Sequence, residues 1–246
     1  MDLYAFGPIA AALDTASEFV ISVADALGPL AGANSAALAI VLLTLALRTV
    51  LIPVGFSQVR AQRVRERLAP RIADMRRRHA KDGARLQREL AALYAAENAS
   101  PLAGCLPVLV QAPVLSGVYA LFVLPSIAGH ANPLLAHGLF GAPLGTGLLA
   151  AIGSGSVAAI AVPAGVVALI LVVVLVNRRR SLRLAQPGDP ADGGAAAVRA
   201  ARVLSWLPLL TVAFAAVAPL AATVYILVST TWTVVERSIL LQLLPH

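Results

Sequence analysis

Chemically reactive side chains are scarce in this chain. Its 246 residues include one cysteine, Cys105, and four histidines that stand far apart, which excludes an intramolecular disulfide and leaves no ligand set for zinc or haem. There is one lysine and no glycine-rich run ending in Lys-Ser or Lys-Thr, so a nucleotide-binding loop of that type is excluded. No nucleophile has a base at a supporting spacing. We therefore expect neither an enzyme nor a bound cofactor or metal.

Charged residues are also few, at 13% of the chain, whereas 59% of the residues are hydrophobic. Several apolar stretches are long enough to cross a bilayer, and this composition exceeds that of soluble domains. No lysine or arginine precedes Arg48, so the start lacks the positive region of a secretory signal peptide. The sequence therefore predicts an all-α, polytopic membrane protein.

Five apolar segments predict transmembrane helices, because lipid offers no partner for an unpaired backbone group. Eleven basic residues lie between positions 57 and 100 and six between 177 and 202, while 1–35 and 125–156 hold none. Since basic loops stay in the cytoplasm, the N-terminus is predicted outside and the C-terminus inside.

The predicted order begins with an extracytoplasmic segment, 1–35, and ends with a short cytoplasmic tail, 236–246. The five predicted spans are 36–56, 102–124, 157–176, 203–218 and 220–235. Between them lie a cytoplasmic hairpin at 57–101, an extracytoplasmic loop at 125–156 and a basic cytoplasmic loop at 177–202. The last two spans are short, so we expect either longer helices or local thinning of the bilayer.

Two further helical units are expected outside the spans. A helix over residues 8–30 would place Asp14, Glu18 and Asp25 within about 40° of one another, which favours an amphipathic helix on the outer surface over a sixth span. Residues 57–101 carry apolar side chains at helical spacing on both sides of a Lys-Asp-Gly turn, which predicts an antiparallel helical hairpin. Pro70 is expected to kink or restart its first helix.

Arg48 is the most informative residue because it lies near the middle of the first predicted span. An arginine at the centre of a membrane helix costs roughly 2.5–3.5 kcal/mol even on the lenient insertion scale. The side chain could extend to the headgroups, but Phe56 is eight residues away, about 12 Å along a helix. We favour an alternative in which Arg48 faces a wet cavity inside the protein.

Other polar residues in the spans define a candidate substrate groove around Arg48. Thr44 shares the face of Arg48 at i, i+4 spacing, and further polar residues come from the second and fifth spans. Packing between helices alone also explains single residues such as Ser229 or Thr233. The predicted groove residues are Arg48, Thr44, Gln111, Tyr225, Ser229, Thr230 and Thr233.

The arginine-rich hairpin offers several partners. Its eleven positive charges would bind phosphate, but Tyr94 is its only aromatic residue, so stacking against nucleic-acid bases lacks support and DNA is not expected. Attraction to anionic lipid headgroups is the favoured explanation. Contact with a ribosome or with a substrate polypeptide stays open.

Four segments, within about Ala36 to Arg237, carry a pattern typical of one family. They read LALRTVLIPV, RLAPRIADMRRRHAKDGARLQREL, SPLAGCLPVLVQAPVLSGVYALF and WLPLL followed by APLAATVYILVSTTWTV. Together they resemble the YidC/Oxa1/Alb3 family of membrane protein insertases. The third segment is the most specific, because Pro101, Gly104, Cys105, Gln111 and Pro113 match the family pattern together, as does Pro107. The short N-terminal segment without a lipoprotein signal resembles actinobacterial members.

The resemblance implies a five-helix core with a groove open to the cytoplasm and lipid, and it assigns the groove arginine to Arg48. In this family the positive charge is thought to attract acidic translocated tails of nascent membrane proteins, without nucleotide hydrolysis. A bacterial plasma membrane location is implied, with the Sec translocon and the ribosome as open partners. The family's Asn-Pro is Ser100-Pro101 here, its Tyr-Trp is Tyr225-Ile226, and a long basic C-terminal tail is missing.

A small-molecule or ion transporter is the alternative function. A proton-coupled transporter needs a carboxylate within the membrane, and only Glu236, at the end of a span, comes close. An insertase also uses an amphipathic cytoplasmic hairpin, for which a transporter has no evident need. The sequence therefore favours an insertase and membrane chaperone.

Overall fold

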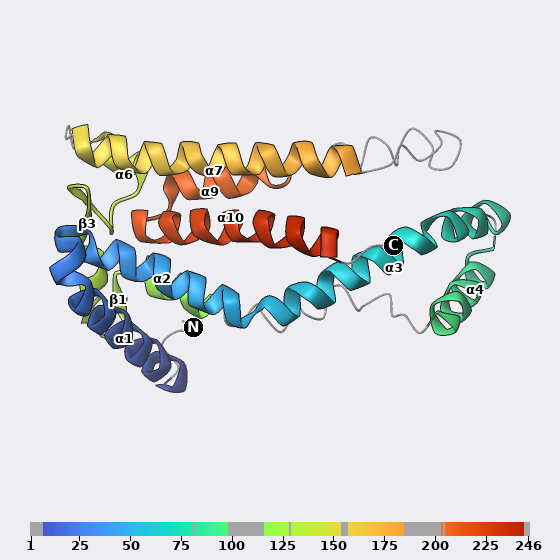
Figure 1. Cartoon of the computed structure of the whole chain (residues 1–246), viewed down its shortest axis with the longest axis horizontal. Coiled ribbons are helices and arrows are strands. Elements are labelled where there is room, and N and C mark those ends of the chain that lie inside the picture. The colour runs from blue at the N-terminus through green and yellow to red at the C-terminus, as the bar shows by residue number, and fades with distance from the viewer. Residues whose placement is uncertain are drawn as a thin grey trace.

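The computed structural model describes residues 7–80, 82–97, 116–127, 129–153, 157–184, 203 and 205–243. Most of these residues are helical, as Figure 1 shows. The long helices are α1 (Gly7–Ala31), α2 (Ser35–Val50), α3 (Ile52–Arg78), α4 (Gly83–Ala96), α7 (Val157–Leu184) and α10 (Leu220–Leu243). Shorter helices are η2 (Gly32–Asn34), η3 (Pro133–Ala136), α6 (Leu148–Ile152) and α9 (Leu209–Val217), and residues 116–123 are also helical.

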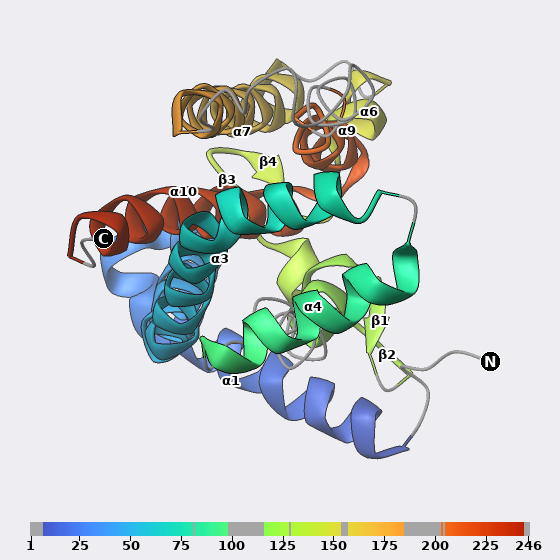
Figure 2. The same ribbon diagram turned by 90° about the vertical axis from the view of Figure 1, so that its right-hand side faces the viewer.

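Three of the long helices, α2, α10 and α7, lie side by side with α10 in the middle, and α9 packs against α7 (Figures 1 and 2). Small residues in α2 and α10, among them Ala36, Ala37, Ala221 and Ala222, are buried at 4% exposure or less. Small side chains let two helix backbones approach closely, which is how membrane helices gain packing energy. The central layer of the fold is therefore the α2–α10 contact.

Helix α1 turns back through η2 and packs against α2. Leu13, Val20 and Ala24 are buried, and their spacings of seven and four residues, about two turns and one turn, place them on one face. Gly32 in η2 has φ +54°, a conformation that favours glycine. The predicted surface location of residues 8–30 stays a prediction, because the helix continues the apolar stretch of α2.

The segment between residues 124 and 153 is more ordered than a loop. β1 (Ser126–Ile127) pairs with β2 (His130–Ala131), and β3 (Gly138–Leu139) pairs with β4 (Ala142–Pro143), both antiparallel. The amide of Ala221 donates to the carbonyl of Leu144 at 2.9 Å, which attaches the segment to the start of α10. A Cβ on Gly147 would lie 2.6 Å from the Val217 carbonyl oxygen, so this close approach requires glycine.

Helices α3 and α4 pack together as a hairpin that projects from the helical layer (Figure 1). Asp82 caps α4 by accepting from the Arg85 amide at 2.9 Å. Arg67 and Arg71 both bind Glu97, at 2.7 and 3.2 Å, and join the two helices at their other end. Helix α3 continues through Pro70, so the chain does not restart there.

The prediction of a mostly helical membrane protein is confirmed. Among the described residues three helices are long and apolar enough to cross a membrane: Ala10–Val50, Ala159–Leu182 and Leu220–Leu243. Helix α10 is longer than the predicted 220–235, whereas α9 is shorter than the predicted 203–218. Most of 102–124 lies outside the described residues, so the five crossings and their orientation stay predictions.

Candidate functional site

Arg48 lies in the last turn of α2, where the helix breaks at Leu51 before α3 begins. Its side chain is half-buried and makes no hydrogen bond or ion pair within 4.0 Å to any residue that the structure describes. Thr44, one turn earlier, is 3% exposed and donates its Oγ1–H to the Ile40 carbonyl at 2.6 Å. The hydroxyl of Thr44 is thus satisfied by its own helix, whereas the guanidinium of Arg48 is free to take a partner.

Glu236 of α10 is an acidic residue whose charge acts on Arg48. The two side chains interact electrostatically, although no N–O distance within 4.0 Å joins them. A Cβ added to Gly55 of α3 would lie 2.9 Å from the Glu236 Cδ. The carboxyl of Glu236 therefore occupies the space that a side chain at position 55 would fill.

One face of α10 carries three buried polar atoms that have no hydrogen-bond partner in the described structure. They are the Tyr225 hydroxyl, the Ser229 hydroxyl and the Trp232 Nε1. Together with Glu236 these residues follow the spacing i, i+4, i+7, i+11, which keeps them on one helical stripe. The Trp232 Nε1 approaches the Glu236 carboxyl without reaching hydrogen-bond geometry. We call Tyr225, Ser229, Trp232 and Glu236 the polar stripe.

The polar stripe follows α10 past three other elements. Its first residue, Tyr225, packs against Phe122 with ring centroids 5.7 Å apart. Trp232 shares a groove with Leu45 of α2, and Glu236 reaches Gly55 of α3. Buried polar groups without partners are rare in proteins because each costs about 1–3 kcal/mol. The stripe thus holds three buried polar atoms whose hydrogen bonds are not made within the described structure.

The other predicted groove residues differ in their surroundings. Thr230 donates to the Ile226 carbonyl at 2.7 Å and Thr233 donates to the Ser229 carbonyl at 2.9 Å, so both hydroxyls are satisfied within α10. Thr230 also lies about 100° around the helix from Ser229. Gln111 lies outside the described residues. Thr44 and Arg48 thus lie on α2 and Tyr225 and Ser229 on α10, two helices that pack against each other.

An apolar groove of about 270 Å³ borders the polar stripe. Val41 and Leu45 of α2 form one wall. The α10 wall consists of Leu227, Val228, Thr231, Trp232 and Val235. Trp232 and Glu236 were not among the predicted groove residues, but their spacing from Tyr225 and Ser229 was visible in the sequence. The site thus combines a free positive charge, a line of polar atoms and an apolar wall.

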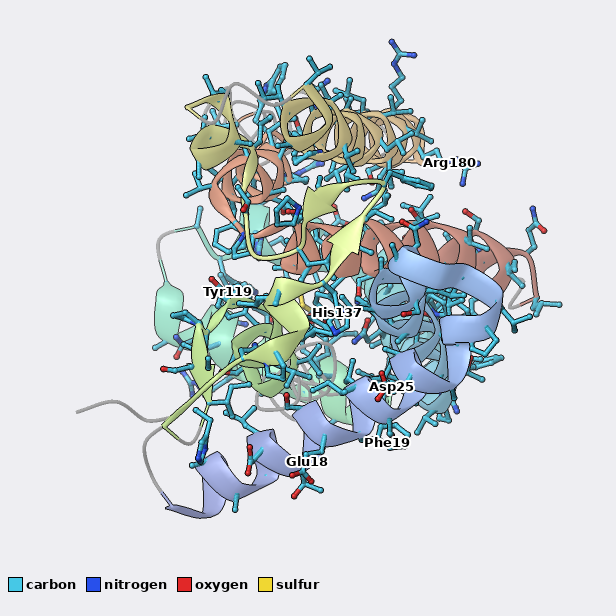
Figure 3. The ribbon with its side chains drawn as sticks, turned by 90° about the vertical axis from the view of Figure 1, so that its left-hand side faces the viewer. Glu18, Phe19, Asp25, Tyr119, His137 and Arg180 are labelled. Carbon is cyan, nitrogen blue, oxygen red and sulfur yellow. The ribbon has the colours of Figure 1, made fainter. Side chains whose placement is uncertain are left out.

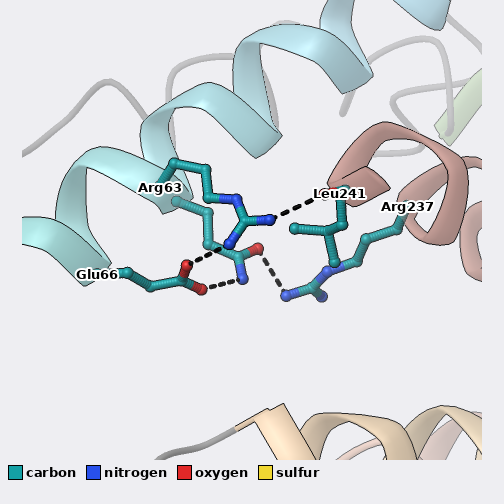
Figure 4. A network of polar contacts seen from close by, with 5 residues as sticks. Arg63, Glu66, Arg237 and Leu241 are labelled. Atoms are coloured by element: carbon teal, nitrogen blue, oxygen red, sulfur yellow. Dashed lines mark hydrogen bonds and ion pairs between the residues drawn. The ribbon is translucent and has the colours of Figure 1, made fainter. Parts of the chain in front are cut away.

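A polar network holds α3 against the final turns of α10 (Figure 4). Arg63 donates to the Leu241 carbonyl at 2.9 Å, and Arg237 donates to the Gln62 side-chain oxygen at 2.7 Å. Gln62 and Arg63 both contact the Glu66 carboxylate. This network fixes the base of the hairpin beside Glu236 and thereby positions α3 at the end of the groove.

Comparison with known proteins gives consistent matches. The family model described as 60Kd inner membrane protein matches residues 27–245. A membrane protein insertase YidC of Clostridium perfringens is 36% identical over 83 residues, which cover 34% of this chain and 35% of that protein. The insertase YidC of Caulobacter vibrioides is 35% identical over 94 residues, 38% of this chain and 15% of that protein. The insertase YidC of Aquifex aeolicus is 32% identical over 87 residues, 35% of this chain and 17% of that protein.

Proposed function

Since the chain belongs to the 60Kd inner membrane protein family, the YidC/Oxa1 family, we propose that it inserts nascent membrane proteins into the bilayer along the α2–α10 groove. The family match extends over nearly the whole chain. The resemblance noted in the sequence is thereby confirmed. The aligned relatives match about a third of this chain and a third or less of their own length, so the activity, substrates and partners of this chain are our proposal.

The predicted bacterial plasma membrane location is confirmed by these bacterial relatives and by the apolar helices able to span a membrane. Helix α7 and the turn that precedes α9 offer a marker for one membrane surface. The Arg178 guanidinium carbon lies 3.9 Å from the ring centroid of Trp206. Tryptophan and arginine both favour the headgroup level. In the proposed orientation this contact would lie at the cytoplasmic headgroups, where Arg178 could bind anionic lipid.

The absence of an ion pair at Arg48 among the described residues is the observation that carries the proposal. A half-buried cation gains more from an incoming carboxylate than an exposed one, because water screens it less. An acidic tail of a substrate would supply that carboxylate. The polar stripe would then bond the tail's backbone groups, which lose water as the segment enters the membrane.

The apolar groove would bind the second part of a substrate, its transmembrane segment. A transmembrane segment is itself apolar, and burial of its surface in lipid provides the driving force without nucleotide energy. Val41 and Leu45 on one side and Val228 and Val235 on the other would hold such a segment beside the polar stripe. The acidic tail and the apolar segment of a substrate would thus contact separate, adjacent surfaces of this protein.

Glu236 keeps an ion transporter as the second candidate function, because α10 brings this carboxylate next to Arg48. A transporter would need Glu236 to carry a proton or a cation. Glu236→Gln would then abolish transport. For an insertase the same change removes a negative charge from the groove and leaves activity on acidic substrates intact or increased.

The insertase proposal is tested with purified protein in liposomes. A single-span substrate is made with an acidic or a neutral N-terminal tail, and its protease-protected insertion is measured. We expect wild type to exceed protein-free liposomes. Arg48→Ala should lose most of the stimulation for the acidic tail and less for the neutral one, since a partly buried charged hydrogen bond is worth about 1.5–3 kcal/mol.

Arg60→Ala provides the matched control, because Arg60 is an exposed arginine of α3. Equal losses in Arg48→Ala and Arg60→Ala would show that net charge alone matters and would overturn the role of Arg48. No stimulation by wild type would overturn insertion by this chain alone.

A further inference from the structure

A second cavity lies between α1 and the β1–β2 hairpin, far along the fold from the hairpin of α3 and α4. Its volume is about 350 Å³, within the range of pockets that hold small organic molecules. Figure 3 shows Glu18 and Asp25 on α1, the helix that forms one wall. The cavity is lined by Asp14, Ser17, Glu18, Ile21, Ile127 and His130, and by 131–133.

The two carboxylates of the cavity lie one helical turn apart. Asp14 and Glu18 are at i, i+4 spacing on α1 and make no ion pair or hydrogen bond with the residues that the structure describes. Like charges at this spacing destabilise a helix. No lysine or arginine occurs in residues 1–35 or 125–156. Apart from His130, which lines the same cavity, a cation for this pair must therefore come from elsewhere in the chain or from another molecule.

Ser17 supplies an independent sign that the cavity takes a polar ligand. It lines the cavity at 5% exposure. Serine in a helix ordinarily donates to the carbonyl four residues earlier, as Thr15 does to Ala11 on the same helix. The Ser17 hydroxyl makes no such bond within the described structure. A hydroxyl that lines a cavity without a protein partner is available to donate to a polar ligand or to water there.

The opposite wall is rigid. Gly129, with φ +84°, allows the tight turn that pairs His130 with Ile127 across the hairpin. Asn132 is 5% exposed; it donates to the carbonyls of Leu121 and Leu124 and accepts from the Leu134 amide. The wall is thus held to the end of the helix at 116–123, so the cavity is formed before any ligand arrives.

The lining also indicates what kind of cation fits. No group of three or more His, Cys, Asp or Glu residues in the described structure comes together as metal ligands. Ile21 and Ile127 add apolar surface to the wall. Two carboxylates, a hydroxyl and an apolar wall match a protonated amine or guanidinium on an aliphatic stem. We propose that this cavity binds such an organic cation, either a free amine or the side chain of a basic residue in a polypeptide.

The proposal is tested by calorimetric titration of the whole purified protein in detergent at low salt. The probes are putrescine for a free amine, N-acetyl-arginine amide for a polypeptide side chain, and Mg²⁺. We expect saturable binding of at least one organic cation. Asp14→Asn and Glu18→Gln should each weaken it at least about threefold, because each removes one partly exposed charge pair. Whichever organic probe binds more tightly identifies the source.

Asp25→Asn is the matched control, because it removes the same charge from the same helix outside the cavity lining. Ser17→Ala should weaken binding while the melting temperature stays unchanged. An equal loss in Asp25→Asn would reduce the site to general electrostatic attraction and overturn the proposal. Absence of binding up to about 10 mM, or Mg²⁺ binding that is lost in the same variants, would also overturn it.

Discussion

Glu236 of α10 places its carboxyl where a side chain on Gly55 of α3 would otherwise lie, 2.9 Å between Cδ and an added Cβ. The contact joins the base of the hairpin to an acidic side chain that interacts electrostatically with Arg48. Gly55 therefore sets how closely a resident negative charge can approach the groove arginine.

Gly55→Ala is predicted to move the Glu236 carboxyl, because the flexible glutamate gives way more easily than the helix backbone. The protein should still fold, since alanine favours a helix over glycine by about 1 kcal/mol. Insertion of an acidic-tailed substrate should rise in Gly55→Ala and in Glu236→Gln, and the two changes together should add little more. Fully additive effects in the liposome assay would show that Gly55 acts independently of Glu236.

Gln62→Ala is predicted to loosen the end of α10. The change removes the acceptor of Arg237, a charged hydrogen bond at the surface worth about 0.2–1 kcal/mol. Amide hydrogen exchange of residues 237–243 should become faster. Gln87→Ala, at an exposed glutamine of α4, is the control and should leave these rates unchanged. Unaltered exchange in Gln62→Ala would mean that the Arg63 bond to Leu241 alone holds the helix end.

Asn132→Ala is predicted to destabilise the ordered segment before α6. It deletes three hydrogen bonds to backbone groups at a buried position, which costs about 1–3 kcal/mol. The melting temperature in detergent should fall by at least about 2 °C. Asn177→Ala, a half-buried amide of α7, should change it less. A similar loss in both variants would contradict the anchoring role of Asn132.

Glu89 makes the hairpin sensitive to acid. The hydrogen bond from Arg85, together with the contact to His79, holds the pKa of the Glu89 carboxyl below its ordinary value. A group whose pKa is lower in the folded state stabilises that state above its unfolded pKa, and this stabilisation is lost as the pH falls through the folded pKa. Protection of the α4 amides, corrected for intrinsic exchange, should therefore decline below about pH 4.5.

In Glu89→Gln this acid-dependent step should disappear, since glutamine does not titrate. The variant should already show reduced protection of α4 at neutral pH. Retention of the step in Glu89→Gln would assign it to another carboxylate of the hairpin, such as Glu97 with its two arginine partners.

The helices α3 and α4 could be predicted from sequence, and Arg48 could be singled out as a candidate site residue, because each depends on local information. Apolar side chains at helical spacing on both sides of a turn predict α3 and α4. A single arginine in a long apolar run is unusual whatever surrounds it. The satisfied hydroxyls of Thr230 and Thr233 follow the same local rule, in which a threonine donates to its own helix.

Glu236 illustrates what the sequence did not provide. The predicted span stopped at residue 235, with Glu236 just beyond its end, but α10 continues to Leu243. The proximity of Glu236 to Arg48 and Gly55 depends on how α2, α3 and α10 pack together. The order of residues 124–153 was missed for the same reason, since Asn132 bonds to carbonyls that precede it by eight and eleven residues.

The sequence by itself determined a helical membrane protein of an insertase family, because composition, periodicity and motif spacing are properties of the chain alone. Only the tertiary structure decided which polar atoms lack partners. Whether a hydroxyl, an indole or a guanidinium is satisfied depends on side chains brought together from distant segments, and packing in three dimensions alone sets those distances.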